Sequence, residues 1–256
     1  EYLKEAVDSV LSQTYSDFEI VFFDNCSTDS TKKIIKSYLD PRIRYFHSSD
    51  FLSLGEARNQ AIRNSKGDLI AFLDCDDLWF PKKLELQAPV FDNEKVGIVI
   101  SDTIFFDSIK DRRQLFKKTK PPTGRVFRNL LLNYFISMET AVVRKSALES
   151  LDHWFDPSFN VIEEYDLFLR IAYDHDLEFV DSVLAKWRIH DSSWTWSKSD
   201  LFSQERIVLF NKLKDIIPDF SETNYRDEFR AFQRSIDWDV ARLHWKKKEN
   251  QKARLL

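Results

Sequence analysis

Short apolar runs alternate with helix-spaced apolar positions along the first part of the chain. Apolar residues that recur every three or four positions predict amphipathic helices, whereas short runs rich in Val, Ile and Phe predict strands. The predicted helices cover 1–13, 29–39 and 54–65, and the predicted strands cover 17–25, 42–48, 68–73 and 96–107. Strands that alternate with helices in this way predict an α/β fold with a mostly parallel sheet flanked by helices.

The pattern changes in the second half of the chain. Residues 108–125 are basic and contain prolines, which is typical of an exposed loop or an edge excursion. The segment 163–176 has the spacing of an amphipathic helix, and 177–190 is typical of a strand or a hairpin. From 199 to 256 the spacing is helical again, so we predict one domain over 1–198 followed by a C-terminal helical extension.

Composition narrows the classes of protein that fit. With only 4 glycines in 256 residues, the chain does not favour a fold built on glycine-rich phosphate loops. A net charge of -4 gives no reason to expect nucleic acid as a partner. The 2 cysteines, Cys26 and Cys75, make no disulfide framework, and no segment resembles a signal peptide or a membrane span, so we expect a cytoplasmic protein.

A cluster of carboxylates follows the predicted strand at 68–73. Asp74, Asp76 and Asp77 surround Cys75 at the carboxyl end of that strand, where open α/β sheets bind their ligands. Asp74 and Asp76 project to the same side of an extended segment and repel each other unless a cation lies between them. Carboxylate oxygens suit Mn²⁺ or Mg²⁺, although a solvated acidic turn that caps the next helix would show the same pattern.

A second acidic strand end lies earlier in the chain. Asp24 follows the apolar run of the strand at 17–25, and Asp29 lies at the expected start of the next helix, where it could also be a helix cap. Neighbouring strands with polar ends can form one cleft, with one end for a base or ribose and the other for a metal and a diphosphate. A helix that begins beside such a cleft offers backbone N–H groups to anions.

Several segments together resemble the family 2 glycosyltransferases of GT-A fold, in order and in spacing. The segments are YLKEAVDSVLSQTYSDFEIVFFDNCSTDST, ARNQAI, GDLIAFLDCDD, EEYDLFLRI and WRIHDSS, and the resemblance covers roughly residues 2–195. It implies the GT-A fold and the transfer of a sugar from a nucleoside diphosphate donor to an acceptor hydroxyl. It also implies inversion at the sugar and the use of a divalent metal, Mn²⁺ or Mg²⁺.

The resemblance further implies which residues bind the nucleotide sugar. Asp24 would hydrogen-bond the base, usually uracil, and Asp29 lies in the same nucleotide-binding turn. Arg58 would lie near the diphosphate or the donor sugar, and Asp74 would lie toward the ribose and the donor sugar. Arg188 could add positive charge for the leaving group, although a role on the surface of a strand suits it equally.

Metal ligands and a catalytic base are implied at three further places. Asp76 would be the main metal ligand, and the late His190 would approach the metal or the diphosphate. An inverting transfer needs a base that takes the proton of the attacking hydroxyl. The family usually has Glu-Asp where this chain has Glu163 and Glu164, and its second acid aligns with the base. Glu164 is therefore the expected base, with Glu163 as the fallback.

Partners and location follow from the same resemblance. We expect a nucleotide-sugar donor, usually a UDP-sugar, and a glycan or lipid-linked acceptor in the synthesis of a bacterial surface glycan. The basic stretch HWKKKENQK at 244–252 could hold the C-terminal helices at an anionic membrane, dock a partner protein, or be a solvated helical face. The expected location is cytoplasmic, and peripheral contact at the inner membrane face is a further hypothesis.

Two rival hypotheses stay open. A sugar-phosphate nucleotidyltransferase shares the α/β plan and the metal chemistry, but the acidic pair before the late helix and the RIH segment favour glycosyl transfer. The family's first strand should precede Glu1, and we expect that earlier residues supply it. If that strand is truly missing, a catalytically inactive scaffold of a glycan assembly complex becomes the second alternative.

Overall fold

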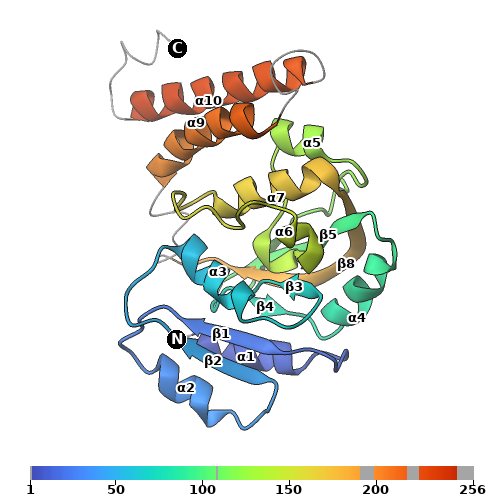
Figure 1. The fold of residues 1–256 in the computed structure, drawn as a ribbon, viewed down its shortest axis with the longest axis vertical. Coiled ribbons are helices and arrows are strands. Elements are labelled where there is room, and N and C mark those ends of the chain that lie inside the picture. The colour runs from blue at the N-terminus through green and yellow to red at the C-terminus, as the bar shows by residue number, and fades with distance from the viewer. Residues whose placement is uncertain (1, 108, 191–198, 218–224, 247–256) are drawn as a thin grey trace.

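The computed structural model describes residues 2–107, 109–190, 199–217 and 225–246. Figure 1 shows three tiers: a small α/β unit at the N-terminal end, a larger sheet with its helices in the middle, and two long helices at the other end. The predicted α/β class, with helices flanking a sheet, is therefore confirmed.

The N-terminal unit is a parallel pair of strands covered by two helices. Its elements are α1 (Leu3–Leu11), β1 (Ile20–Asp24), α2 (Thr31–Ser37) and β2 (Ile43–His47). The two strands run in the same direction, with Asp24 opposite His47 at their carboxyl ends. The helices pack on the strands because each places its apolar side chains on one stripe. Asp24 thus lies at the carboxyl end of a parallel pair.

The larger sheet mixes strand directions. Its order is β3-β7-β5-β8-β4, and β6 pairs with β5 outside this path. The strands are β3 (Leu69–Ala71), β4 (Leu78–Trp79), β5 (Val96–Phe106), β6 (Asp111–Gln114), β7 (Val142–Arg144) and β8 (Asp176–Arg188). Within the described residues of this sheet, β5 and β8 are the one parallel pair, and its other pairs are antiparallel.

The prediction of a mostly parallel sheet is therefore corrected for this part of the chain. Antiparallel neighbours can be joined by a tight turn, whereas parallel neighbours need a long crossover. β6 returns beside β5 through such a turn, in which the Asp107 N–H donates to Lys110 O at 3.1 Å. Apolar periodicity shows where a strand lies but not the direction of its partner, so the antiparallel pairs could not be predicted from it.

Helices cover the larger sheet and share its apolar core. They are α3 (Leu54–Arg63), α4 (Lys83–Gln87), η1 (Ala88–Asp92), α5 (Phe127–Leu132), η2 (Met138–Thr140), α6 (Lys145–Glu149), α7 (Glu163–Asp174), α9 (Ser199–Ile216) and α10 (Arg226–Lys246). One cluster of fully buried side chains includes Phe168 of α7, Leu209 of α9 and Phe232 of α10. Each such side chain stabilises the fold by about 1.5–3 kcal/mol. The C-terminal helices are thus packed onto α7.

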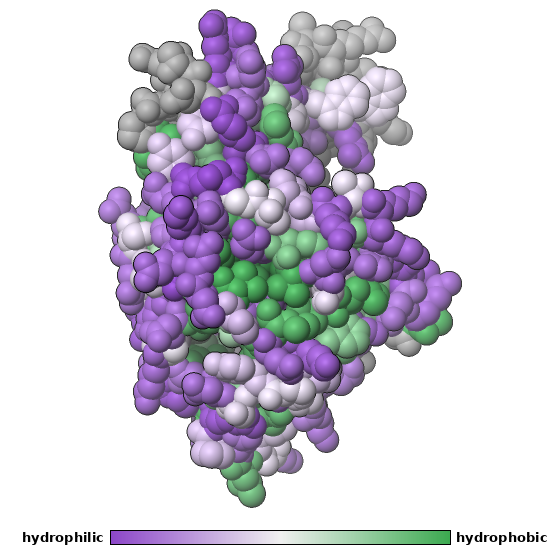
Figure 2. Space-filling model, turned by 90° about the vertical axis from the view of Figure 1, so that its right-hand side faces the viewer, coloured by the Kyte–Doolittle hydropathy of each residue, from purple (hydrophilic) through white to green (hydrophobic). Residues whose placement is uncertain are grey.

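The surface and the ends of the chain bear on the predicted extension. No helix in the described ranges is long and apolar enough to cross a membrane. On the face shown in Figure 2, apolar surface gathers in the middle of the molecule, between hydrophilic surface above and below it. Helices are present after residue 199, as predicted, but the boundary itself stays a prediction because 191–198 lie outside the described residues. Most of the basic stretch at 244–252 also lies outside them.

A buried lysine ties the segment after the acidic turn to the neighbouring η2. Lys83 begins α4, is fully buried, and donates to Gln87 Oε1 and to Thr140 O. Its Nζ lies 4.8 Å from the ring centroid of Trp79, whose indole N–H donates to Glu139 O at 2.9 Å. Burial lowers the pKa of Lys83 to about 7, although the negative charge of Glu139 opposes this shift.

We expect Lys83 to make the stability of the fold depend on pH. Between pH 7 and about 10 the unfolded chain keeps the proton that the folded lysine has released. The free energy of unfolding therefore rises with pH in that window, by at most about 1.4 kcal/mol per pH unit. Lys83→Met removes this slope and spares the Gln87 hydrogen bond to Thr140 O. Urea unfolding of both proteins across the window measures the difference, and parallel profiles would contradict a neutral buried lysine.

Candidate active site

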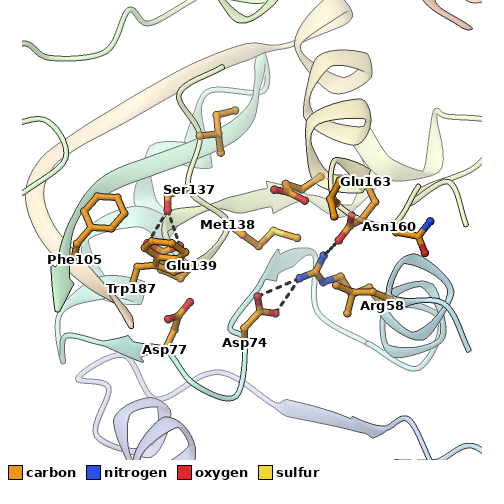
Figure 3. Close-up of a pocket in the computed structure, with 14 residues that line it drawn as sticks. Arg58, Asp74, Asp77, Phe105, Ser137, Met138, Glu139, Asn160, Glu163 and Trp187 are labelled. Atoms are coloured by element: carbon orange, nitrogen blue, oxygen red, sulfur yellow. Dashed lines mark hydrogen bonds and ion pairs between the residues drawn. The ribbon is translucent and has the colours of Figure 1, made fainter. Parts of the chain in front are cut away.

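A pocket of about 270 Å³ lies where α3, the turn after β3, η2 and the start of α7 meet. Figure 3 shows Phe105 and Trp187 on one side of it and Arg58, Asp74 and Glu163 on the other. Four residues that the resemblance implied for the site line this one cavity: Arg58, Asp74, Glu163 and Glu164. They come from three separate segments, α3, the turn after β3 and the start of α7, so the fold assembles a polar wall from separate elements.

Arg58 on α3 connects the acidic turn to α7. Its Nη1 donates to Glu163 Oε1 at 2.6 Å, and its Nη2 donates to the two oxygens of Asp74 at 2.9 and 3.2 Å. Burial lowers the pKa of Arg58, but the charges of Asp74 and Glu163 raise it more, and the net pKa lies above the usual value. One guanidinium therefore neutralises charge from two elements and fixes their relative positions.

Glu163 and Glu164 form the first turn of α7. Glu163 is buried, and while its Oε1 accepts from Arg58, no partner for its Oε2 exists among the described residues. Burial raises the pKa of Glu163 against the lowering effect of Arg58. Burial and the neighbouring charge of Glu163 raise the pKa of Glu164 to about 8. A carboxyl group with this pKa can accept a proton near neutral pH, as a general base must.

Asp76 and His190 meet although 114 positions separate them. Asp76 Oδ2 lies 2.8 Å from His190 Nε2, and both side chains are partly exposed. The contact arises because β4 pairs with β8, with Leu78 opposite Lys186. This pairing places the turn before β4 beside the residues that follow β8. The two residues predicted as metal ligands are therefore brought together by the sheet.

The carboxylate of this pair fits a hard divalent cation. Mg²⁺ and Mn²⁺ bind carboxylate and phosphate oxygens, and a site with few protein ligands leaves coordination positions for phosphate oxygens and water, whereas the imidazole is a less typical ligand for them. The other two aspartates of the turn have protein partners: Asp74 accepts from Arg58, and Asp77 accepts from the Arg188 backbone N–H at 2.8 Å. Asp76 is thus the aspartate whose surroundings best suit a metal.

Arg188 braces the acidic turn. Its Nε donates to Asp76 O at 2.7 Å, and its Nη2 donates to Glu5 Oε2 on α1 at 2.9 Å. Its guanidinium lies 4.1 Å from the ring centroid of Tyr2, and the residue is only 6 % exposed. These contacts hold α1, the turn and the end of β8 together. A direct contact of Arg188 with the donor stays a prediction.

Asp24 and Asp29 do not line this pocket and lie in the N-terminal unit. Asp24 is buried, and its oxygens accept from the Ser27 N–H at 2.9 Å and the Tyr45 hydroxyl at 2.6 Å. Burial raises the pKa of Asp24, but these hydrogen bonds lower it more, so the group is ionised at neutral pH. Asp29 is exposed and accepts from the Thr31 N–H at 2.9 Å just ahead of α2, although the N-cap residue of that helix is Ser30. Nucleotide binding by both stays a prediction.

The opposite side of the pocket was not predicted from the sequence. There Glu139 accepts from Ser137 Oγ at 2.7 and 2.8 Å, and the rings of Phe105 and Trp187 meet edge to face with centroids 5.0 Å apart. Burial and the nearby charge of Glu139 raise the pKa of Asp77. An acid inside the apolar segment FISMETAVV was the available signal for Glu139. The two rings lie on separate strands, and nothing in the sequence pairs them.

The chain resembles known glycosyltransferases over most of its length. The family described as glycosyl transferase family 2 matches residues 1–152, which is more than half of the chain. An uncharacterized glycosyltransferase of Methanocaldococcus jannaschii, MJ1057, is 29% identical over 194 residues, which cover 74% of this chain and 66% of that protein. The Escherichia coli protein WfgD, a UDP-Glc:alpha-D-GlcNAc-diphosphoundecaprenol beta-1,3-glucosyltransferase, is 27% identical over 225 residues, which cover 86% of this chain and 81% of WfgD.

Solved structures show the same fold at lower identity. S. aureus TarS 1-349 in complex with UDP-GlcNAc superposes with a TM-score of 0.68 at 17% identity, over 99% of this chain and 86% of that one. The mannosyltransferase PcManGT from Pyrobaculum calidifontis, in complex with GDP-Man and Mn2+, gives a TM-score of 0.67 at 17% identity, over 99% and 69% of the two chains. The GT-A fold is thereby confirmed, and the family match shows that the chain belongs to glycosyl transferase family 2.

Proposed function

We propose that this glycosyltransferase moves a sugar from a UDP-sugar to a hydroxyl group of a glycan or lipid-linked acceptor, with inversion at the anomeric carbon and with Mn²⁺ or Mg²⁺. The observation that carries the proposal is the assembly of Arg58, Asp74, Glu163 and Glu164 around one pocket. The turn that supplies Asp74 to that pocket also supplies Asp76 to the pair with His190. A donor site, a leaving-group site and a base thus lie on connected segments.

The donor is proposed to be held from both strand ends. Asp24 would accept a hydrogen bond from uracil, and Asp29 would lie in the same turn. Asp74 would lie toward the ribose and the donor sugar, and Arg58 would lie near the diphosphate or the donor sugar. The choice of UDP is supported by TarS, whose structure was solved with UDP-GlcNAc, and by the UDP-Glc donor in the name of WfgD. PcManGT, solved with GDP-Man and Mn2+, makes GDP the comparison to test.

Asp76 and His190 would hold the divalent cation beside the diphosphate. When bound there, the cation supplies positive charge for the leaving group. Arg188 contributes by bracing the turn, since its Nε and Nη2 are engaged by Asp76 O and Glu5. The chain's own role at this end of the site is to keep the turn and the end of β8 in a fixed place.

Glu164 is proposed as the catalytic base. The acceptor oxygen attacks the anomeric carbon while its proton passes to the Glu164 carboxylate, and the bond from that carbon to the diphosphate oxygen breaks with its electron pair on the diphosphate. Burial and the charge of Glu163 keep the carboxyl basic enough to take this proton, although the charge of Arg58 lowers the pKa of Glu164. Arg58 in turn holds Glu163, which precedes the base in the first turn of α7.

For the acceptor and the location we propose only a chemical class and a compartment. The lipid-linked acceptor in the name of WfgD supports an acceptor of that class here, in the synthesis of a cell-envelope polysaccharide. A cytoplasmic enzyme in peripheral contact with the inner membrane face would reach such an acceptor. The division into a domain over 1–198 and a helical extension is kept as part of this proposal. Family membership decides against a sugar-phosphate nucleotidyltransferase, whereas the inactive scaffold is left to experiment.

Calorimetric titration of the chain with UDP and GDP, in Mn²⁺ and in EDTA, tests the proposal. UDP should bind at least about tenfold more tightly in Mn²⁺, as a cation that bridges protein and diphosphate requires, and GDP should bind more weakly than UDP. Incubation with a panel of UDP-sugars should then reveal one that is slowly hydrolysed in Mn²⁺ and not in EDTA. Absence of nucleotide binding in every condition would favour the scaffold instead.

A further inference from the structure

The loop that precedes the two active-site glutamates is held by a carboxylate from the C-terminal helices. Glu205 lies on α9 and is 7 % exposed. Its Oε1 accepts from the Asn160 backbone N–H at 2.8 Å and from the Asn160 side-chain amide at 3.2 Å, and its Oε2 accepts from the Val161 N–H at 3.0 Å. Both oxygens of one carboxylate therefore bind the backbone directly before Glu163.

Local sequence does not fix this backbone by itself. The residue that precedes α7, Ile162, has no side chain that could cap the helix. The N–H groups at the start of a helix lack partners within the helix. Asn160 and Val161 lie directly before the start of α7, so their N–H groups also need partners from elsewhere. A buried carboxylate that accepts two backbone N–H groups makes charge-assisted hydrogen bonds, which are stronger than neutral ones. Glu205 thus supplies from another part of the chain what the loop lacks.

The face of α9 that carries Glu205 also contacts α7 itself through Lys212. Lys212 follows Glu205 by seven residues, or about two helical turns, so both side chains lie on one side of α9. Lys212 Nζ lies 2.7 Å from Asp156 Oδ2, 2.8 Å from Asp166 Oδ1 and 3.0 Å from His153 Nε2. His153, Asp156 and Asp166 have the composition of a metal site. The ammonium group among them makes the cluster an ion-pair network that fastens α9 to α7.

We propose that Glu205 is a positioning residue for the base Glu164. The Glu205 carboxylate fixes the backbone at 160 and 161. That backbone determines the position of the first turn of α7, and the first turn determines where the Glu164 carboxylate lies in the pocket. Asn160 and Val161 themselves line the pocket, so the same contacts shape its wall. The C-terminal helices are then a working part of the active site rather than an appendage. The inference rests on the proposed role of Glu164.

Glu205→Ala is the variant that tests the inference. Misplacement of a reacting group by about 1 Å can cost about 100-fold in rate, so kcat should fall by about 10- to 100-fold. The Kd for UDP should stay within about twofold, because no donor-binding residue lies on the loop. Glu205→Gln keeps one acceptor oxygen and should restore part of kcat. If Glu205→Ala does not fold, the kcat of Glu205→Gln decides, and no decrease relative to wild type would overturn the proposal.

Arg206→Ala is the matched control on the neighbouring position. Arg206 donates to Asp239 and to Ser235 of α10, and among the described residues it has no hydrogen bond or ion pair with the loop at 160 and 161. Arg206→Ala removes the ion pair between α9 and α10. This variant should have a lower melting temperature and an unchanged kcat. A decrease in kcat that is equal in the Arg206→Ala and Glu205→Ala proteins would show a merely structural role and overturn the inference.

Hydrogen exchange separates this inference from the proposed function. The backbone N–H groups of Asn160 and Val161 should exchange faster in Glu205→Gln than in wild type, and at the wild-type rate in Arg206→Ala. Unchanged exchange in Glu205→Gln would show that Glu205 does not hold the loop, and this would overturn the inference even if the enzyme is active. If the wild-type chain transfers no sugar, or if Glu164→Gln is fully active, the proposed base fails, while the exchange rates still report whether Glu205 holds the loop.

Discussion

Glu164→Gln is expected to stop sugar transfer while donor binding is nearly unchanged. Loss of a general base costs about 10²- to 10⁴-fold in rate, and kcat should fall by that factor. Glutamine has almost the same size as glutamate and keeps the pocket wall, so the Kd for UDP should remain within about twofold. Single-turnover transfer and calorimetric titration of the same preparation measure the two effects separately.

Glu164→Asp and Glu163→Gln are the controls for this substitution. Aspartate keeps a carboxylate one methylene shorter, so Glu164→Asp should retain part of the activity. In the wild-type enzyme kcat/KM should rise with pH through about 8, where Glu164 loses its proton. Full activity in Glu164→Gln together with an inactive Glu163→Gln would move the base to Glu163, which was the fallback in the sequence analysis.

Glu164→Gln should also stabilise the fold at pH 8. The sign of this change in the free energy of unfolding follows from the raised pKa of Glu164 in the folded chain. The pKa of Glu164 is raised in the folded chain to about 8, so the folded state holds a proton that the unfolded state releases near pH 4.5. Stability contributed by this group is therefore lost as pH rises from 4.5 to 8. A glutamine at position 164 does not titrate, so the variant keeps its stability as the pH rises. Its free energy of unfolding at pH 8 should exceed that of the wild type by on the order of 1–3 kcal/mol.

Local patterns sufficed for what is local in the site. The acidic turn after a buried strand was visible in the sequence, and so was the acidic pair at the start of an amphipathic helix, because each is a short contiguous signal. The family resemblance added the late histidine. The structure shows why these signals belong together: the antiparallel pairing of β4 with β8 brings Asp76 to His190, and Arg58 spans from Asp74 to Glu163.

What the sequence could not predict depends on the direction and packing of distant segments. The mixed sheet is one case, since alternation of apolar residues is the same in parallel and antiparallel strands. Glu205 is another, because a glutamate on an amphipathic helix has the pattern of an ordinary surface residue until α9 is packed on α7. Glu139 and Trp187 are a third, because they line one pocket only when η2 and β8 come together.

Asp76→Asn is expected to remove the part of UDP binding that depends on metal. A neutral amide is a much weaker ligand than a carboxylate for a hard cation. The ratio of UDP affinity in Mn²⁺ to that in EDTA should therefore fall close to one. Because charge stabilisation by a bound cation is worth several kcal/mol in the transition state, kcat/KM should fall by about 10³-fold. Titration in Mn²⁺ and EDTA and steady-state kinetics measure these two quantities.

Asp77→Asn is the matched control within the same turn. Asp77 is buried and accepts from the Arg188 N–H, and an asparagine oxygen can still accept that hydrogen bond. This variant should keep the Mn²⁺ dependence of UDP binding, because Asp77 Oδ1 is engaged by the Arg188 N–H, whereas the proposed cation binds at Asp76 and His190. If Asp76→Asn keeps the same dependence, the cation does not bind at Asp76. The 2.8 Å contact with His190 would then only hold the end of β8 against the acidic turn.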